Sequence, residues 1–415
     1  MSIPRLCILT GTYYPVVGGG ETQTRNLAEG LMRRGSVATV ITRRTDPALQ
    51  AVDQVGGVDV YRLAPVGPGQ LKKWGLLMTS PLALIRWRQR YDVIMVSGFS
   101  VLGLPAVLTA RLLGKPCILK ADILGEMSGA MYEAGLRKLG IRPNTWVLRT
   151  LLRLRNHALR RADAFVAICS VMADEFREHG IHPRAIYEIP NSVDTNRFHP
   201  VSDAEKRQLR HELNLPLDDI LVTFTGRLVS YKGLPLLLRT WQAIHHEHRQ
   251  ARLLLVGAGG LDIHNCEAEL RAYTQAHDLG SSVCFTGAVE NVHQYLQASD
   301  LFVFPTEKEA FGISLIEAMA CALPVISTRV GGLADILVHR QNGWVIEAGD
   351  GQQLGEALHR LMTDPTLRAD LGASARRTVK ERYTTEQVIQ TYVDLLAWAV
   401  APAEHTLPQM SVRGK

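Results

Sequence analysis

One stretch in the second half of the chain, FPTEKEAFGISLIEAMACALPVI from Phe304 to Ile326, constrains the fold more than any other. The apolar run Leu301–Phe304 is typical of a buried strand, and the Pro-Thr pair that follows ends it. Apolar residues then recur at helical spacing from Ile313 to Ala320, and a proline precedes the next apolar run. The stretch therefore predicts a β-loop-α-β unit, the repeating element of a parallel α/β sheet.

Two glutamates mark the loop and the helix of this unit. Glu309 lies just before the helix and Glu317 follows about two helical turns later, so a ligand lying along the helix can meet both carboxylates. The first turn, Phe311 to Ser314, offers unpaired backbone amides to an anion, and Gly312 allows a ligand to approach the backbone closely. The alternative interpretation is a solvated acidic loop followed by an ordinary surface helix.

The length of the chain and the alternation of strand-like and helix-like segments indicate two α/β domains. A chain of 415 residues is too long for one hydrophobic core and suits two domains of roughly 200 residues each. Strand-like runs alternate with amphipathic segments in both halves, which favours parallel sheets with helices on both faces. The segment Pro190–Pro200, PNSVDTNRFHP, is typical of a connection between domains.

The first domain is predicted to open with a strand at Leu6–Thr10, a glycine-rich turn at Gly11–Gly20, a helix at Glu21–Arg34 and a strand at Val37–Thr42. The glycines of that turn precede a helix N-terminus, where free amides favour a phosphate. A run of glycines alone is weak support for such a site, and a flexible loop is the alternative.

Charge divides unevenly between the halves. Residues 1–190 carry 25 Lys and Arg against 14 Asp and Glu, whereas residues 191–415 carry 21 against 26. Basic residues gather with Trp146 and several leucines in residues 136–161, and again in the apolar segment Leu71–Arg90, where Pro81 is expected to break any helix. These segments suggest an anionic acceptor or an anionic membrane surface, with simple solvation as the alternative and nucleic acid disfavoured.

Cysteine usage and hydropathy predict a cytoplasmic location. The basic segments add the prediction that the protein contacts the inner face of the membrane peripherally. The six cysteines form no C-x2-C pair and are expected to be buried free thiols in a reducing compartment. No apolar run approaches the roughly 18 residues that a membrane span needs, and no signal peptide is expected.

The string around Glu309 and Glu317 resembles the E-x7-E region of glycosyltransferase family 4, retaining sugar transferases of the GT-B type. It matches down to the Phe-Gly after the first glutamate and the Glu-Ala-Met-Ala-Cys at the second. Two further strings resemble the family: P-x-x-G-G-G-E ahead of Glu21, and G-R-x-x-x-x-K-G from Gly226 to Gly233. The resemblance covers nearly the whole chain and is strongest from Gly226 to Gly343.

The resemblance implies two Rossmann-like, doubly wound parallel-sheet domains that face each other across a cleft. The first would comprise residues 1–195 plus a closing helix at 384–402, and the second residues 196–383. Residues 403–415 are expected to form a disordered tail.

The resemblance also implies roles for individual residues, all directed at a nucleotide-sugar donor. Arg227 and Lys232 would hold the donor diphosphate, Glu309 the sugar hydroxyls and Glu317 the ribose diol. The other residues expected to contact the donor are glycines and backbone amides, namely Gly18, Gly19, Gly20, Gly226, Val289, Phe311, Gly312, Ile313, Ser314 and Leu315. No metal or other cofactor is expected, since the cations would neutralise the leaving phosphate and the chain has no D-x-D triplet.

One position departs from the family pattern. The strand predicted at Pro116–Lys120 is followed by KADILGEMSG, and Asp122 stands about where the family commonly has a histidine near the reacting sugar. An aspartate can accept a hydrogen bond from a sugar hydroxyl but does not titrate near neutral pH as histidine does. The alternatives are that Glu126 has taken this role or that Asp122 merely caps a turn.

The predicted function is retaining transfer of a hexosyl unit from a UDP- or GDP-sugar to a lipid-linked or saccharide acceptor, in polysaccharide or glycolipid synthesis. The alternatives are a sugar-nucleotide-binding regulator without turnover and a sugar-nucleotide epimerase of similar fold. Three neighbouring histidines, His245, His246 and His248, invite a metal-site interpretation, but no second ligand cluster stands at a diagnostic spacing. A solvated helix face is therefore the favoured interpretation of these histidines.

Overall fold

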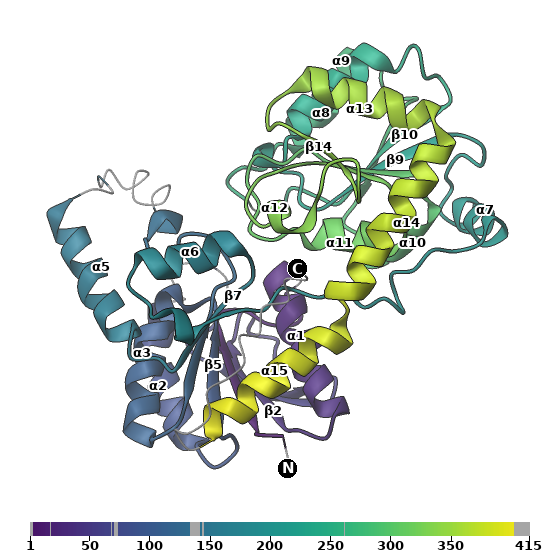
Figure 1. The fold of residues 1–415 in the computed structure, drawn as a ribbon. Coiled ribbons are helices and arrows are strands. Elements are labelled where there is room, and N and C mark those ends of the chain that lie inside the picture. The colour runs from purple at the N-terminus through teal and green to yellow at the C-terminus, as the bar shows by residue number, and fades with distance from the viewer. Residues whose placement is uncertain are drawn as a thin grey trace. The chain divides into compact units, whose positions relative to one another are not determined.

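The computed structural model describes residues 3–16, 18–67, 69, 74–132, 142, 145–260 and 262–401. The chain divides into two compact units, Met1–Asn191 with Thr385–Lys415 and Ser192–Thr384 (Figure 1). The expected domain boundaries, after residue 195 and before residue 384, lie within a few residues of these divisions. The expected disordered tail, 403–415, lies outside the described residues.

The first domain is built on an eight-stranded sheet. The first two strands in the order given below pair antiparallel at one edge, and every other neighbouring pair is parallel. In sheet order the strands are β3 (Val52–Val55), β4 (Val58–Leu63), β2 (Ala38–Arg43), β1 (Leu6–Thr10), β5 (Val93–Ser97), β6 (Cys117–Lys120), β7 (Ala164–Ala167) and β8 (Ile186–Glu188). The order reverses at β1, so this is a doubly wound sheet, and ligands bind such sheets beyond the carboxyl ends of the strands.

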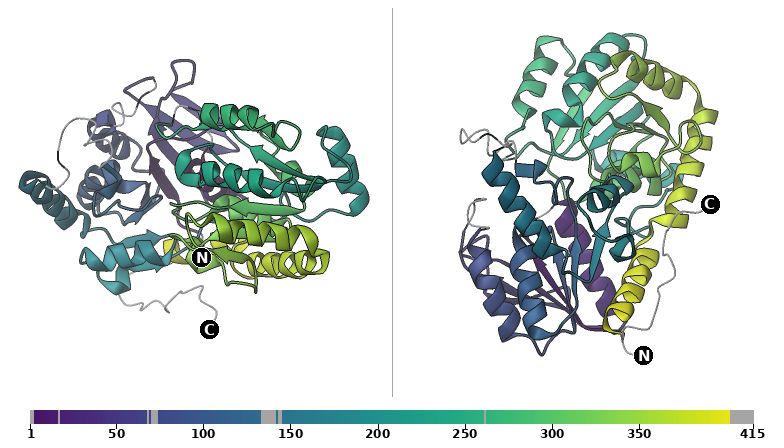
Figure 2. Two further views of the ribbon diagram at one scale, coloured as in Figure 1. Left: turned by 90° about the horizontal axis from the view of Figure 1, so that it is seen from above. Right: turned by 60° about the vertical axis from the view of Figure 1, so that its left-hand side comes forward.

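Helices cover both faces of this sheet (Figures 1 and 2). Alternate residues of β1 point to opposite faces, and Leu6 and Ile8 join a core made with two helices on one side, α1 (Gly19–Arg33) and α15 (Thr385–Val400). The helices on the other face are α2 (Leu76–Arg86), α3 (Phe99–Leu113), α5 (Trp146–Leu159) and α6 (Ser170–Glu178). The last helix of the chain thus completes the core of the first domain.

The second domain has a six-stranded sheet that is parallel throughout. In sheet order its strands are β11 (Val283–Gly287), β10 (Ala251–Val256), β9 (Ile220–Thr225), β12 (Leu301–Phe304), β13 (Val325–Thr328) and β14 (Trp344–Ile346). One face carries α8 (Leu234–Ile244), α9 (Glu267–Ala276) and α13 (Gly351–Thr363), and the other carries α7 (Asp203–Glu212), α10 (Val292–Ala298), α11 (Ile313–Ala320) and α14 (Pro365–Arg382). The predicted α/β architecture is confirmed in both domains.

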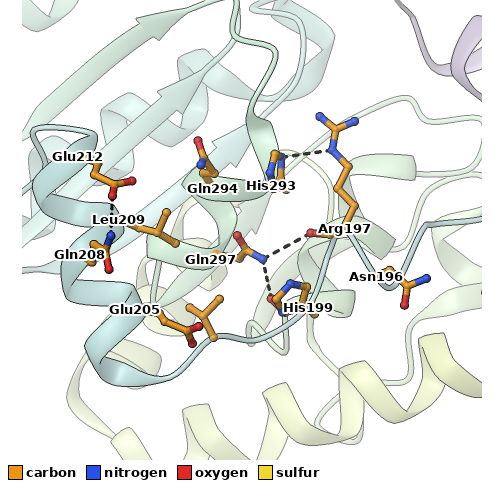
Figure 3. A pocket seen from close by; sticks show the side chains of 11 residues that line it. Asn196, Arg197, His199, Glu205, Gln208, Leu209, Glu212, His293, Gln294 and Gln297 are labelled. Atoms are coloured by element: carbon orange, nitrogen blue, oxygen red, sulfur yellow. Dashed lines mark hydrogen bonds between the residues drawn. The ribbon is translucent and has the colours of Figure 1, made fainter.

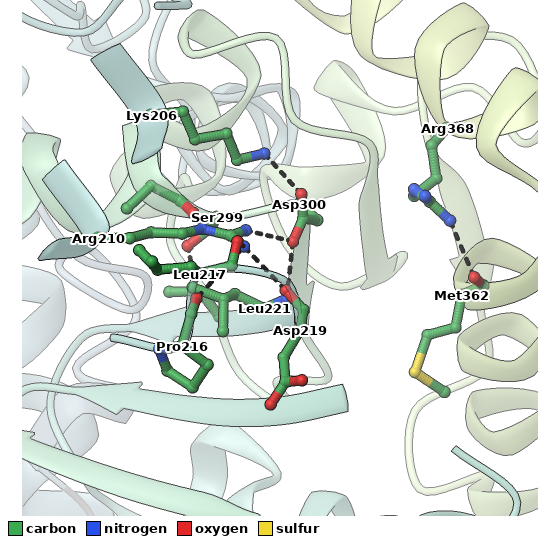
Figure 4. Close-up of polar contacts among 12 residues, drawn as sticks. Lys206, Arg210, Pro216, Leu217, Asp219, Leu221, Ser299, Asp300, Met362 and Arg368 are labelled. Atoms are coloured by element: carbon green, nitrogen blue, oxygen red, sulfur yellow. Dashed lines mark hydrogen bonds and ion pairs between the residues drawn. The ribbon is translucent and has the colours of Figure 1, made fainter. Parts of the chain in front are cut away.

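A buried ionic cluster attaches α7 to the second sheet (Figure 4). The carboxylate of Asp300 lies 2.6 Å from a guanidinium nitrogen of Arg210 and 2.5 Å from Nζ of Lys206, and it accepts the backbone N–H of Leu221 at 2.7 Å. The buried Arg210 guanidinium also donates to the carbonyl oxygens of Leu217 and Asp219. Because all three charged groups are paired, and Lys206 stays partly exposed, Arg210 can be buried without being an unpaired ion.

Several local predictions from the sequence are wrong. Pro81 does not break its segment: it lies inside α2, where it removes one main-chain hydrogen bond while the helix still buries Leu76 and Leu84. The helix expected at Glu21–Arg34 begins at Gly19, which moves two glycines from the turn into its first turn. Cys284 is exposed rather than buried, because β11 is an edge strand of the second sheet.

The two chain segments that connect the domains lie side by side. The N–H of Val193 donates to the carbonyl oxygen of Tyr383 at 2.9 Å, and Val193 pairs with Thr384 in an isolated parallel bridge. The two ends of the second domain are therefore tied to each other.

Candidate active site

Three loops meet at the carboxyl ends of β9, β10 and β12 in the second domain. A Cβ atom added to Gly257, after β10, would lie 1.9 Å from the carbonyl oxygen of Gly226, after β9. A Cβ added to Gly233 would lie 1.9 Å from the carbonyl oxygen of Pro305, after β12. Both glycines have positive φ, so no other residue fits without moving the neighbouring backbone. This packing brings the predicted cations and glutamates to one edge of the sheet.

Lys232 and Glu309 form an ion pair at this edge. Nζ of Lys232 lies 2.5 Å from Oε2 of Glu309, and both side chains are largely buried. The other carboxylate oxygen of Glu309 accepts the N–H of Ala310 at 3.0 Å, which fixes its orientation. The ammonium also lies 4.9 Å from the ring centroid of Phe304, a cation–π distance. The sequence expected these two residues at one site, and the structure brings them into direct contact.

Arg227 lies on the same loop and is far more exposed. Its guanidinium pairs with the carboxylate of Asp262 and donates to the hydroxyl of Tyr231 at 2.9 Å. The Arg227 side chain is 61% exposed, whereas that of Asp262 is 15% exposed. Because the guanidinium is largely exposed and has five N–H donors, it can contact a bound anion while it stays paired with Asp262.

The N-terminus of α11 lies beside these cations. Gly312 precedes the helix with φ of +104°, and a Cβ there would lie 2.4 Å from Leu333. A Cβ on Gly226 would lie 4.0 Å from the hydroxyl oxygen of Ser314, so the loop after β9 runs next to the first turn of α11. Leu315 is buried, whereas Ile313 and Ser314 are half-buried. The helix therefore offers its free amides, rather than large side chains, next to the loop that carries Arg227.

Phe311 faces the core instead of the site. It is 3% exposed, and its ring meets the ring of Tyr383 in an edge-to-face contact with centroids 5.9 Å apart. Any contact that Phe311 makes with a donor must therefore involve its backbone. The structure leaves that predicted backbone role untested.

Glu317 lies just over one turn along α11 and keeps a partly exposed surface. Burial raises the pKa of its carboxyl to about 7, and the nearby charge of Arg197 opposes that rise. No donor to its carboxylate is found within the described parts of the chain. A carboxyl group that is costly to ionise and has no donor among the described residues is a candidate for binding a ligand hydroxyl.

Arg197, from the connection between the domains, organises the neighbouring loop (Figure 3). It donates to the carbonyl oxygen of Glu290 at 2.8 Å and to Nδ1 of His293 at 3.3 Å. The loop from Gly287 to Glu290 contains Val289, whose side chain packs partly buried against the core around Leu254. Arg197 thus links this loop, whose Val289 is expected to contact the donor, with the charge environment of Glu317.

The first domain has its own cavity at the carboxyl ends of β1, β5 and β6, with a volume of about 240 Å³. It is lined by polar groups from Thr12, Glu21, Ser97, Asp122 and Glu126, among others. The glycines Gly18, Gly19 and Gly20 form the N-terminus of α1 next to it, and a Cβ on Gly20 would lie 3.8 Å from the Asp122 carboxyl carbon. The glycine turn and Asp122 therefore belong to one pocket.

Asp122 is held from two sides. One carboxylate oxygen accepts the hydroxyl of Ser97 at 2.6 Å, and the other pairs with the ammonium of Lys120. The Lys120 side chain is 5% exposed and that of Asp122 is 19% exposed, so the anion is neutralised by a buried cation yet remains reachable. This environment supports a hydrogen-bonding role for Asp122 rather than that of a free turn cap.

Glu126, the alternative to Asp122 for hydrogen-bonding a sugar hydroxyl, already accepts hydrogen bonds from backbone N–H groups. Its carboxylate accepts the N–H groups of Ser100 at 2.8 Å and Asp122 at 2.9 Å. Burial and the nearby Asp122 carboxylate raise the pKa of Glu126 to about 8, and the donated backbone N–H groups oppose the rise. Glu126 shapes the loop after β6, and its lone pairs are largely used for that purpose.

Three residues of these sites were missed by reasoning from the sequence: Lys120, Arg197 and Asp262. Lys120 ends an apolar strand, where a lysine is normally expected to be exposed. Its position two residues before Asp122 was the available signal, because residues two apart in an extended chain point to the same side. Arg197 and Asp262 carried no signal, since their partners are distant in the sequence.

Comparisons with known proteins agree with this geometry. The family described as "Glycosyl transferase 4-like domain" matches residues 18–192, and the family described as "Glycosyl transferases group 1" matches residues 205–378. The two matches fall in the two structural domains.

Relatives and solved structures cover nearly the whole chain. The N-acetyl-alpha-D-glucosaminyl L-malate synthase of Bacillus anthracis is 26% identical, over 92% of this chain and 94% of its own length. The D-inositol 3-phosphate glycosyltransferase of Corynebacterium jeikeium is 32% identical, over 86% of both chains. The structure of Anabaena Alr3699/HepE in complex with UDP-glucose superposes with a TM-score of 0.75 at 20% identity, covering 94% of this chain and 99% of that one. The family matches, these relatives and the two parallel-sheet domains identify the chain as a glycosyltransferase of family 4 with the GT-B fold.

Proposed function

We propose that this glycosyltransferase transfers a hexosyl unit, with retention of configuration, from a UDP- or GDP-sugar to a lipid-linked or saccharide acceptor. The observation that carries the proposal is the cluster of Arg227, Lys232 and the N-terminus of α11 at one sheet edge, beside Glu309. A nucleotide-sugar offers the matching groups, namely a diphosphate, sugar hydroxyls and a ribose diol.

Departure of the nucleoside diphosphate would be assisted by this cluster. Breaking the bond between the sugar and the diphosphate develops negative charge on the phosphate, and two fixed cations with oriented amides stabilise that charge without reorganisation. Lys232 is positioned by Glu309, and Arg227 by Asp262 and Tyr231. We propose that no metal is needed for donor binding, because these groups supply the positive charge.

Binding of the donor would use the two glutamates differently. Glu309 would accept hydroxyls of the donor sugar with the carboxylate that also pairs with Lys232. Glu317 would accept the ribose diol, which supplies the hydrogen bonds that its carboxyl lacks in the free protein. Backbone groups around Val289 would contact the base. The shape of this loop, rather than a side chain, would then decide between uracil and guanine.

The acceptor would enter the cavity of the first domain. Asp122, whose other carboxylate oxygen pairs with Lys120, can accept a hydrogen bond from an acceptor or donor hydroxyl. Retention would follow from attack on the same face of the sugar from which the diphosphate departs, with the acceptor proton passing to that phosphate. The relatives named for malate and inositol 3-phosphate make small anionic molecules a second class of acceptor to test.

The first domain also has a surface suited to peripheral contact with an anionic membrane. One side of α5 exposes Trp146, Val147, Leu151 and Leu154, with Trp146 77% exposed. Residues at these spacings share one helix face, and the exposed Arg149 and Arg153 flank it. No helix in the described ranges is long and apolar enough to cross a membrane. Apolar side chains flanked by arginines are the pattern of a helix that lies in an anionic lipid interface.

Neighbouring helices extend this surface. Helix α3 packs against both α2 and α5, and the three lie together on one face of the first sheet (Figures 1 and 2). Met78 and Leu82 on α2 and Leu112 on α3 are each more than two-thirds exposed. The basic residues at 72, 73, 137 and 138, which the sequence also assigned to this region, lie outside the described residues.

A thermal-shift panel tests the donor proposal. Purified protein is titrated with UDP- and GDP-sugars without added metal, and the matching donor at 100 times its dissociation constant is expected to stabilise the fold by about 2.7 kcal/mol. Glu317→Ala should abolish the shift, and Glu269→Ala, an exposed glutamate of the same domain, should retain it. A shift that survives in Glu317→Ala would contradict the assigned site.

Product analysis separates the alternatives. With donor and acceptor present, the anomeric configuration of the product read by NMR tests retention directly. Binding without turnover for any acceptor would favour a regulator, and conversion of the donor sugar without an acceptor would favour an epimerase.

Vesicle flotation tests the membrane contact. The protein should float with vesicles that contain phosphatidylglycerol, less so at high salt, and not with pure phosphatidylcholine. The double change of Trp146 and Leu151 to serine should abolish flotation, whereas Val52→Ser, at an exposed edge-strand valine, should not. Equal flotation of all three proteins would exclude α5 as the contact.

A further inference from the structure

Three side chains that bind transition metals lie together on the second domain, on the face that carries α8 and α13. They are Glu247 and His248, just after α8, and His359 on α13. Nε2 of His248 lies 3.0 Å from Nδ1 of His359, and that Nδ1 lies 3.9 Å from Oε2 of Glu247. The sequence favoured a solvated face for the histidines after α8, because His359 lies 111 residues away and its approach was not visible.

Close packing of two helices creates this arrangement. Along α13, Gly351, Gly355 and His359 follow one another at intervals of four residues, and a Cβ on Gly355 would lie 3.5 Å from Thr240 and 3.8 Å from Ile244. A Cβ on Gly351 would lie 3.1 Å from Leu236 and 3.3 Å from Thr240, so α13 packs closely on α8 at that position, and Gly355 lies in ordinary contact distance of the same helix. His248 lies in the turn that follows α8, four residues after Ile244, and there it meets His359 of α13.

We propose that Glu247, His248 and His359 bind one transition-metal ion, with zinc as the best match, and that water or His246 completes the coordination. Two imidazoles and a carboxylate form a ligand set typical of zinc and unlike the all-oxygen sets of magnesium. Two nitrogens bound tetrahedrally at about 2.0–2.1 Å from zinc are roughly 3.3 Å apart, close to the observed separation.

The location separates this site from sugar transfer. Helix α8 begins directly after Lys232 and Gly233 and ends three residues before Glu247. Its 11 residues span about 16 Å, so the metal would lie at the opposite end of the helix from the candidate active site. A bound ion would tie the end of α8 to α13 and stabilise the second domain, without contacting the donor.

Calorimetric titration of the tag-free, chelator-treated protein with zinc chloride provides the test. Wild-type protein should bind one equivalent, and magnesium should give no heat. His359→Ala should weaken zinc binding more than about 10-fold, the lower bound for changes at or near a metal site. His211→Ala, which removes an exposed histidine of the same domain, should bind as the wild type does.

Thermal unfolding without nucleotide gives a second readout. Zinc should raise the melting temperature of the wild type and of His211→Ala, but not that of His359→Ala, whose metal-free melting temperature shows whether it folds. Absence of zinc binding by the wild type would overturn the proposal. Wild-type affinity in both Glu247→Ala and His359→Ala would overturn it equally.

Discussion

The two candidate sites use ion pairs in opposite ways. In the first domain, the cation of the Lys120–Asp122 pair is almost fully buried and only the anion can be reached. In the second domain, the guanidinium of Arg227 is exposed and its partner Asp262 is largely buried. The first arrangement presents a neutralised acceptor of hydrogen bonds, and the second presents a cation that a phosphate can reach. We therefore expect the first site to suit hydroxyl groups and the second to suit a diphosphate.

Removing the partly buried cation of the second domain should give the largest effect. Lys232→Met is expected to lower kcat by roughly 10²–10³-fold, the range for losing one preorganised group that stabilises developing negative charge. The measurement is steady-state release of nucleoside diphosphate in the presence of acceptor. Arg239→Met, at an exposed arginine on α8, is the matched control. Unchanged kcat in Lys232→Met would refute its role in leaving-group departure.

Breaking the ion pair of the first domain should instead appear as lost stability. Asp122→Ala leaves Lys120 buried without a partner and is expected to lower the free energy of unfolding by about 3 kcal/mol. The double variant with Lys120→Met should recover most of the loss, since no buried charge remains. Urea denaturation measures both, and Asp174→Ala, which removes an exposed pair with Arg177, should change stability by less than about 1 kcal/mol. Equal losses in Asp122→Ala and Asp174→Ala would mean that Lys120 is not truly desolvated.

The raised pKa of Glu317 predicts that replacing its carboxyl will raise the stability of the fold and weaken donor binding. A carboxyl whose pKa rises from 4.5 to about 7 on folding favours the fold when protonated, and this contribution is lost as pH rises through 7. Glu317→Gln should therefore stabilise the donor-free protein at pH 8 by about 1–2 kcal/mol. It should also weaken donor binding.

In the wild type, donor affinity should rise with pH up to about 7 and then level off, because the ionised carboxylate accepts the diol. Thermal unfolding and donor titration at several pH values measure the two effects. A donor affinity that does not change between pH 5.5 and 8 would show that Glu317 does not contact the donor.

The smallest effect is expected at the exposed pair of the second domain. Asp262→Asn should change the free energy of unfolding by less than about 1 kcal/mol, because the guanidinium of Arg227 stays hydrated. Donor affinity should be unchanged or slightly higher, since no carboxylate then competes with the diphosphate. A loss of stability above 2 kcal/mol in urea denaturation would place Arg227 among the structural residues.

Much of the fold was predictable because the decisive segments are strongly patterned. The strand Leu301–Phe304 and the helix from Ile313 to Ala320 have the bounds that their apolar runs and flanking prolines indicate. The strand Val52–Val55 was missed because this edge strand has four residues, of which only Val55 is buried, and so gives too short an apolar pattern to recognise. The prediction that Pro81 breaks a helix was wrong because the tertiary packing of α2 outweighs the loss of one main-chain hydrogen bond.

The candidate sites were predictable only in part. Lys232 and Glu309 follow parallel strands, so the rule that such strands end at one edge placed them near each other. The contacts of Arg197 with Glu290 and of His359 with His248 join residues about 90 or more positions apart. Such contacts depend on how closely particular elements pack, which periodicity does not report. The roles of the site residues toward a donor stay predictions.

The bridge between Val193 and Thr384 bears on how the second domain could be exchanged for another. Since both ends of the second domain emerge at one point, the first domain is the interrupted one, and α15 restores its continuity after the insertion. An insertion with adjoining ends can be exchanged for a homologous one without stretching the host chain. Chimeras made at these two junctions would test the proposal that the second domain determines the sugar donor and the first the acceptor.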